Sequence, residues 1–100
     1  MPYGFQAKMK ARPGHRDEVV AILLSGTEGL RAAGCRRYAV AVSDATDPDR
    51  IWVDELWESK EQHDASLSLP ETKAAIAAAR PLLTGEFTGQ ELTVVGGLGV

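Results

Sequence analysis

The sequence predicts an α+β domain whose elements follow the order strand, helix, strand, strand, helix, strand. Three observations predict it: residues 3–12 alternate between apolar and polar side chains, two later segments have helical spacing or alanine-rich composition, and three more are rich in β-branched and aromatic residues. Two halves of similar size, 3–43 and 51–95, close most simply as a ferredoxin-like βαββαβ fold, with one four-stranded antiparallel sheet and helices on one face. We expect residues 1–100 to form one domain, with its core over about 3–95 and a flexible tail over 96–100.

The first half opens with a half-buried strand over Tyr3–Arg12, in which every second side chain is apolar. Pro13-Gly14 then ends the strand in a turn. From about His15 to Ala33 apolar residues recur at helical spacing, which predicts one amphipathic helix. Gly34 can take the left-handed conformation that ends a helix.

Two antiparallel strands are predicted next, over Cys35–Ser43 and Ile51–Glu58, joined by the turn-forming loop Asp44–Arg50. Apolar side chains occur on both faces of this pair. In the first strand one face carries Tyr38, Val40 and Val42, and the other carries Ala39 and Ala41. In the second strand one face carries Ile51, Val53 and Trp57, and the other carries Trp52 and Leu56. Helices can cover one apolar face, and the simplest partner that would bury the other is a second copy of the chain. We therefore expect a homodimer with its sheets face to face; the alternative is that Trp52 and Leu56 are scattered surface residues.

The second half continues with a capping box, in which the Ser59 hydroxyl accepts a backbone N–H and Gln62 reaches back, so that a helix begins at about Lys60. Leu69-Pro70 interrupts this helix. A second helix over Pro70–Arg80 is predicted by the proline at its start and by its alanines. Gly85–Val95 has the composition of the last strand.

Composition and charge exclude several classes of function. A net charge of −3 and a pI of about 5.3 argue against nucleic acid, which requires clustered Lys and Arg. The longest apolar run, Val19–Leu24, is far shorter than the roughly 20 residues that span a bilayer, and no secretion signal is recognisable. Cys35 is the only cysteine, so no intrachain disulfide can form. We expect a cytoplasmic protein with no membrane partner.

No phosphate-binding loop, nucleophile elbow or zinc-spaced Cys and His cluster occurs in the sequence. His15, His63 and Cys35 lie far apart in the chain, and a zinc site made from them would lack a fourth ligand of the usual kind. We therefore expect no metal and no cofactor.

One pattern carries a family resemblance. It consists of Glu55-x-Trp57-Glu58-Ser59 followed by His63-x-x-Ser66, preceded by Gly34-Cys35-x-x-Tyr38 and by Pro13-Gly14. The pattern resembles the antibiotic biosynthesis monooxygenase family of dimeric α/β barrel proteins and covers about residues 3–95. The resemblance implies oxygenation of an electron-rich aromatic, such as a hydroquinone or an anthrone, by O2 without a cofactor, in a cleft between sheet and helices. A fold supports many activities, so non-catalytic binding or sensing of an aromatic metabolite, and a purely structural dimer with a collapsed cleft, remain alternatives.

Such chemistry requires one base and one aromatic wall, because a phenolic anion in a dry pocket can reduce oxygen directly. His63 is the candidate base, since imidazole titrates near neutral pH; alternatively it is structural and bonds Glu55 or a backbone group. Trp57 is the candidate wall and can point its N–H at a bound oxygen, or it is a core residue beneath the second helix. Tyr38 offers a phenol to the substrate, or closes the edge of the core.

The rest of the cleft is assigned to substrate binding, with the lining residues Phe5, Ala7, Met9, Val53 and Leu67. Glu55 is costly to bury alone, so we expect it to pair with His63, with Arg36 or with a residue of the other subunit.

The family also contains haem-degrading members. Their asparagine on the first strand corresponds to Ala7 here, and their haem-ligating histidine falls within Ala74–Ala79, where this chain has none. The resemblance therefore disfavours haem.

Overall fold

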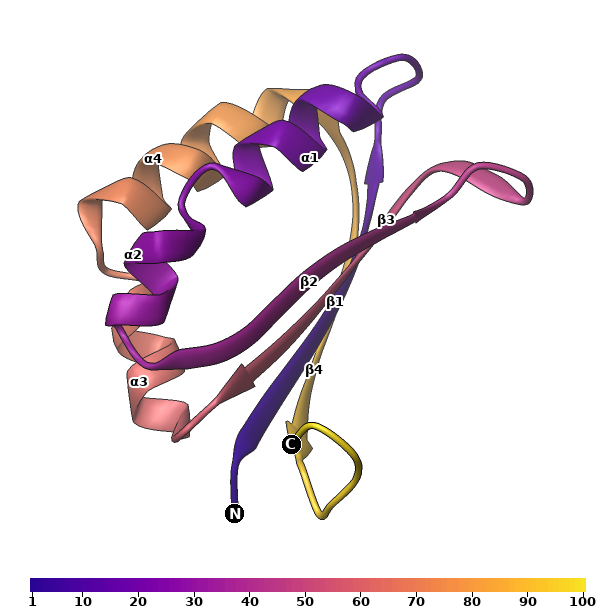
Figure 1. Cartoon of the computed structure of the whole chain (residues 1–100). Helices are drawn as coiled ribbons and strands as arrows, with labels where there is room; N and C mark the ends of the chain where they lie inside the picture. Colours follow the sequence, from indigo (N-terminus) through magenta and orange to yellow (C-terminus); the bar gives the residue numbers. More distant parts are fainter.

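The computed structural model describes residues 1–100 and contains one four-stranded antiparallel sheet with every helix on the same face (Figure 1). The strands are β1 (Tyr3–Ala11), β2 (Cys35–Ser43), β3 (Asp47–Trp57) and β4 (Leu83–Thr93), and the helices are α1 (Arg16–Leu24), α2 (Thr27–Ala32), α3 (Lys60–Ser66) and α4 (Pro70–Ala79), with the 3₁₀ turn η1 (Arg80–Leu82) before β4. The strand order β2-β3-β1-β4 places the first and third strands at the centre. This is the predicted ferredoxin-like architecture.

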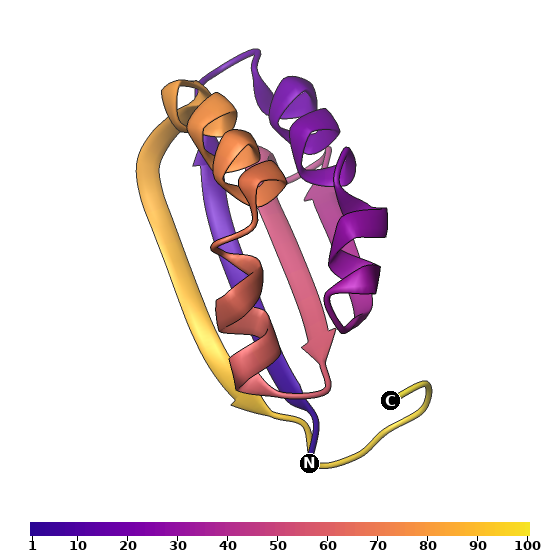
Figure 2. The same cartoon turned by 90° about the vertical axis from the view of Figure 1, so that its left-hand side faces the viewer.

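The hydrophobic core fills the end of the sheet that lies beneath α1. It consists of Ala7, Met9, Ala11, Val19, Ile51 and Val53, each at most 6% exposed. Figure 2, which looks onto the helical layer, shows α1 and α4 side by side over this end, with α2 and α3 over the other. The sheet thus has a packed end under α1 and a second end, under α2 and α3, where polar residues can meet.

The register aligns helix-facing side chains in rows across the strands, since paired residues point to the same face. One row contains Glu91, Phe5, Glu55 and Tyr38, from β4 to β2. The neighbouring row, nearer the start of β1, contains Tyr3, Trp57 and Cys35. These two rows lie under α2 and α3 and position the site described below.

The predicted single helix over 15–33 is wrong, because α1 ends at Leu24 and α2 begins at Thr27. At the break, the Ser25 hydroxyl donates to the Ile22 carbonyl at 2.7 Å and so competes with the regular backbone bonds. Gly26, a poor helix former, follows directly.

The predicted hairpin loop and last strand are corrected in their bounds. β3 begins at Asp47 rather than Ile51. Its first residues extend beyond the end of β1, so Pro48 interrupts no hydrogen bond between β3 and β1. β4 covers Leu83–Thr93 rather than 85–95, since Leu83 already pairs with Ala11. The register shifts opposite Gly85, whose φ of +95° accommodates the irregularity.

Only half of the predicted capping box forms. The Ser59 hydroxyl accepts from the Gln62 backbone N–H at 3.2 Å, as expected. The Gln62 side chain does not reach back, and its buried Oε1 has no partner. It packs instead against Gly34, where a Cβ would lie 2.7 Å from the carboxamide. Gly34 has a φ of +109°, which is the left-handed turn predicted at the end of the first helical segment.

The face of the sheet opposite the helices is mixed in character, whereas the sequence predicted an apolar surface. Trp52 is half-buried there and Leu56 is only 5% exposed. Polar side chains lie among them, and the Gln6 amide donates to the Asp54 carboxylate at 2.9 Å. This open face is therefore a patchwork rather than a continuous apolar surface.

Candidate functional site

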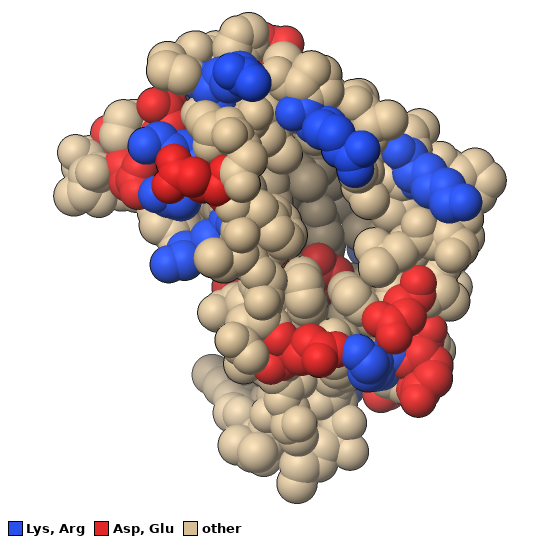
Figure 3. Space-filling view, turned by 180° about the vertical axis from the view of Figure 1, so that it is seen from behind, with Lys and Arg blue, Asp and Glu red and all other residues tan.

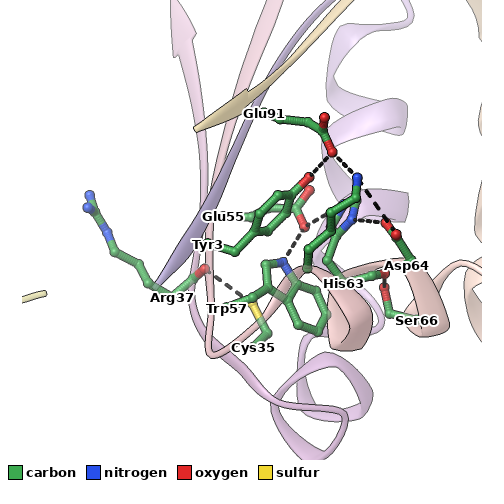
Figure 4. A network of polar contacts seen from close by, with 10 residues as sticks. Tyr3, Cys35, Arg37, Glu55, Trp57, His63, Asp64, Ser66 and Glu91 are labelled. Atoms are coloured by element: carbon green, nitrogen blue, oxygen red, sulfur yellow. Dashed lines mark hydrogen bonds and ion pairs between the residues drawn. The ribbon is translucent and has the colours of Figure 1, made fainter. Parts of the chain in front are cut away.

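The candidate site is a buried polar cluster between β3 and α3 (Figure 4). Glu55 and Trp57 alternate along β3, so both side chains face the helices, and the Trp57 indole N–H donates to the Glu55 carboxylate at 2.9 Å. The Ser59 cap begins α3 and places His63 one turn later, where its Nε2 lies 4.0 Å from Glu55 Oε1. Of the partners predicted for Glu55, the structure brings His63 to it, while Arg36 pairs with Glu58 instead.

Three aromatic rings enclose the His63 imidazole, which is 7% exposed. Its ring centroid lies 4.9 Å from that of Phe5, 5.2 Å from that of Tyr3 and 5.6 Å from that of Trp57, the last edge-on. Its Nδ1 lies 3.0 Å from the carboxylate of Asp64, a side chain that is 52% exposed. The imidazole therefore lies between the largely buried Glu55 carboxylate, which is beyond hydrogen-bond distance, and the exposed Asp64 carboxylate, which is within it.

Burial raises the pKa of the Glu55 carboxyl above its ordinary value. The Trp57 hydrogen bond and the charge of His63 act in the opposite direction and only partly offset it. A carboxylate whose pKa is shifted toward neutrality, held in an aromatic shell, has the properties of a general base. The sequence analysis gave Glu55 a structural role. Its position between Val53 and Trp57 on the buried face was the feature of the sequence that could have indicated a functional one.

The structure places Trp57 in the core, which was the alternative to a cleft wall. Its side chain is 0% exposed and its N–H is engaged by Glu55, so that group is not free to point at a bound oxygen. The alternative, a core tryptophan packed beside the second helical segment, describes its surroundings. Trp57 is thus a positioning residue that holds the Glu55 carboxylate and packs against His63.

Tyr38 lies opposite Glu55 on the neighbouring strand and is half-buried. Burial is the main cause that raises the pKa of its phenol, and the Glu55 charge adds to it. Burial likewise raises the pKa of the Cys35 thiol, which donates to the Arg37 carbonyl at 3.2 Å. Both groups therefore remain protonated at neutral pH.

A second polar group at the rim was missed by sequence reasoning. The Tyr3 hydroxyl donates to the Glu91 carboxylate at 3.0 Å, and the Lys60 ammonium binds the same carboxylate and lies 3.8 Å from Asp64. Burial, and then the bond to Glu91, raise the pKa of Tyr3 to about 12. The sequence could have indicated the contact between Lys60 and Asp64, because the two are four residues apart. It could not indicate the contact between Tyr3 and Glu91, which lie near opposite ends of the chain.

The residues predicted to bind substrate fall into three environments. Ala7, Met9 and Val53 belong to the core, while Phe5 packs on His63. Leu67 follows the last residue of α3 and is 47% exposed, so the structure does not bring it into the buried cluster. Their role in binding stays a prediction.

The Phe5 ring packs closely against Gly89 of β4, which pairs with Ala7 of β1. A Cβ at Gly89 would lie 2.7 Å from the Phe5 ring. Seen from behind, the molecule has a hollow between the sheet and the helical layer, with a mixed group of acidic and basic side chains below it (Figure 3).

Two further cavities lie outside this cluster. One, of about 430 Å³, lies between α2 and β2 and is lined by Tyr38. The other, of about 360 Å³, lies on the open face and is lined by Trp52. Tyr38 is the only one of the three predicted catalytic residues that lines either of them.

No group of three His, Cys, Asp or Glu side chains is arranged to hold a metal ion. No helix has both the length and the apolar composition needed to traverse a bilayer.

Comparisons with known proteins agree with the fold. The profile of the family described as antibiotic biosynthesis monooxygenase matches residues 2–78. A candidate antibiotic biosynthesis monooxygenase from Chloroflexus aurantiacus J-10-fl is 46% identical in sequence and superposes with a TM-score of 0.86, over 99% of this chain and 98% of that one. A candidate member from Caulobacter crescentus CB15 is 25% identical, with a TM-score of 0.84 over 95% and 91% of the chains. No curated protein matches significantly. The chain belongs to the antibiotic biosynthesis monooxygenase family.

Proposed function

We propose that this protein is a cofactor-independent monooxygenase that oxidises a small aromatic substrate of the hydroquinone or anthrone type with O2, in the cytoplasm. The observation that carries the proposal is the Glu55–His63 pair, in which a largely buried carboxylate lies 4.0 Å from an imidazole that three aromatic rings enclose. Family membership supports the reaction class, since the relatives carry the monooxygenase name.

The chain's own residues supply the proton transfers. Glu55 accepts a proton from the substrate, and His63 and Asp64 pass it toward solvent. The resulting carbanion is electron-rich enough to reduce O2, and a new C–O bond forms as a hydroperoxide. Loss of water then leaves a carbonyl. For an anthrone-type CH2 group, two hydrogens leave, one oxygen atom enters the product and the other leaves as water, so the substrate itself supplies all four electrons.

Oxygen uptake tests this proposal directly. We expect anthrone, dithranol or menadiol to consume O2 above the rate without protein, and 18O2 to place one labelled oxygen atom in each anthraquinone formed. Glu58→Gln is a matched control, because Glu58 is an exposed carboxylate on the same segment. Uptake at the background rate with the whole panel contradicts an oxygenase of this class.

The close packing of His63 favours a second candidate function. The His63 imidazole is 7% exposed and touches three aromatic rings, so the cluster leaves little open room for a substrate beside His63. A non-catalytic module that binds or senses an aromatic metabolite would tolerate such packing. Saturable quenching of tryptophan fluorescence by the same panel, with no oxygen consumed, would support this second function.

We further propose that a second copy of the chain covers the open face. Trp52 lines a cavity there together with the opposite charges Lys8 and Asp54, a combination that a two-fold axis makes self-complementary. A dimer would exclude water from this open face of the sheet.

Sedimentation at micromolar concentration should give twice the 10.7 kDa of one chain. Trp52→Glu should shift the mass to that of one chain, because a carboxylate would be buried at the contact. Ile76→Glu, on the exposed side of α4, is the matched control and should leave a dimer. A wild-type protein that sediments as a single chain contradicts the dimer.

A further inference from the structure

The hollow between the sheet and the helical layer opens on the side of α4 and β4. Figure 2 shows α4 and β4 along the same edge of the molecule, and Figure 3 shows the hollow from that side. The inward side chains of α4 are small, namely Thr72, Ala75 and Ala79, so this helix does not fill the space between itself and the sheet. We call the opening the α4–β4 mouth.

One flank of α4 borders this mouth. The Glu71 carboxylate points the other way, because its Oε1 lies 3.9 Å from the position that a Cβ would take on Gly29 of α2. The flank that carries Glu71 therefore faces α1 and α2. Lys73, Ile76 and Arg80 follow one another at spacings of three and four residues, so they share the opposite flank. That flank faces β4.

Two large apolar side chains are exposed at the mouth. Ile76 is 43% exposed and Phe87 is 57% exposed. Phe87 pairs with the core residue Met9, so its ring is on the helix-facing side of β4. Exposed apolar side chains on two facing elements are typical of a ligand site. An aromatic ring placed between Ile76 and Phe87 would shield both from water.

The two cations beside Ile76 are unpaired. Neither Lys73 nor Arg80 forms an ion pair. The helix dipole favours Arg80 at the C-terminal end of α4, but it disfavours Lys73 near the N-terminal end. Helix stability therefore does not explain the position of Lys73. Two unpaired cations beside an apolar opening attract an anionic ligand.

The other end of the mouth is acidic. Glu91 lies four residues after Phe87 on the same face of β4. Its carboxylate and that of Asp64 are bound by a single cation, Lys60. An anionic group is thus favoured beside α4 and disfavoured beside Glu91, so a ligand with one charged end has one preferred orientation.

We propose that the α4–β4 mouth binds a hydroxylated aromatic acid, with the carboxylate on Lys73 and Arg80. Cations bind carboxylates through charge-assisted hydrogen bonds, while Ile76 and Phe87 supply the apolar contacts for the ring. The hydroxyl points into the hollow toward Glu55, whose row of helix-facing side chains continues to β4. This inference rests on the proposed function only in naming the acid as substrate, which is then an anion rather than a neutral phenol.

The test compares 6-hydroxy-2-naphthoate with 2-naphthol, which differs only in lacking the carboxylate. Titration calorimetry under nitrogen at low salt should show the acid binding at least about tenfold more tightly. Lys73→Gln and Arg80→Gln should each weaken the acid about three- to tenfold and leave the phenol unchanged. Phe87→Ala should weaken both probes by a similar factor. Arg31→Gln removes an exposed cation from α2 and is the matched control, which should leave the preference intact.

Three results would overturn the inference: equal affinity for the two probes, an equal loss in Arg31→Gln, or unchanged binding of both probes by Phe87→Ala. Binding under nitrogen involves no turnover, so it separates the two proposals. Tight binding of the acid that depends on Lys73 and Arg80, with no oxygen uptake by any probe, would reject the oxygenase and retain the mouth. Uptake with neutral phenols, and no preference for the acid, would do the reverse.

Discussion

Trp57→Ala should lower the free energy of unfolding by about 3–5 kcal/mol, the cost of removing a fully buried large aromatic. The indole is 0% exposed, packs edge-on against His63 and donates to Glu55. Its loss opens a cavity and leaves the buried carboxylate without that donor. Total stability of a domain of this size is about 5–15 kcal/mol, so the variant should be marginal and melt more than about 12 °C below the wild type.

Trp57→Phe separates the volume of the indole from its hydrogen bond. It keeps most of the buried ring, so it should cost clearly less stability than the alanine variant. It also removes the donor that lowers the pKa of Glu55, so that pKa should rise further. Urea unfolding of both variants checks this order. Equal destabilisation by Phe and Ala would show that packing of the ring is not what holds this end of the sheet.

Glu55→Gln should reduce kcat by about 10²–10⁴-fold, the usual contribution of a general base. The amide oxygen can still accept the Trp57 N–H, so the fold should persist, but the amide cannot take up a proton. In the wild type, kcat/KM should rise with pH through a pKa above that of an ordinary glutamate, because burial disfavours the carboxylate. This acid limb should be absent in Glu55→Gln and present in Glu58→Gln.

The same shift makes a prediction about stability. Since the folded-state pKa of Glu55 is raised, the favourable contribution of its protonated form is fully present below the unfolded-state pKa and is lost as pH rises through the folded-state value. The charged or titratable groups facing it are His63, Tyr38 and Cys35. Urea titrations at several pH values should show this decline in the wild type and less of it in Glu55→Gln. Identical profiles would argue that Glu55 is ionised without cost.

The local features of the fold could be predicted from sequence because each depends on neighbouring residues. Alternation defined β1, and the Ser59 hydroxyl defined the start of α3. The break at Ser25 was missed because helical spacing continues across it, and only the bond of its hydroxyl to Ile22 reveals the interruption. Strand ends depended on pairing partners, as for Leu83 opposite Ala11, and pairing is not local.

Only two members of the buried cluster, His63 and Trp57, were among the predicted catalytic residues. His63 and Trp57 were found from the pattern at the end of β3, but the bond that engages the indole N–H is a matter of side-chain direction. Glu91 reaches Tyr3 from 88 residues away, so spacing along the chain does not signal this contact.

The central position of β1 has a consequence for folding. The first strand pairs with β3 and with β4, the last strand, so the sheet cannot be completed until the chain has closed a loop of nearly its whole length. High contact order of this kind slows folding relative to helical proteins of equal size. Because β4 is an edge strand with almost every residue exposed, its amides should exchange with solvent sooner than those of β1 and β3. We therefore expect the contacts of Glu91 at the rim to form last during folding and to open first during local unfolding.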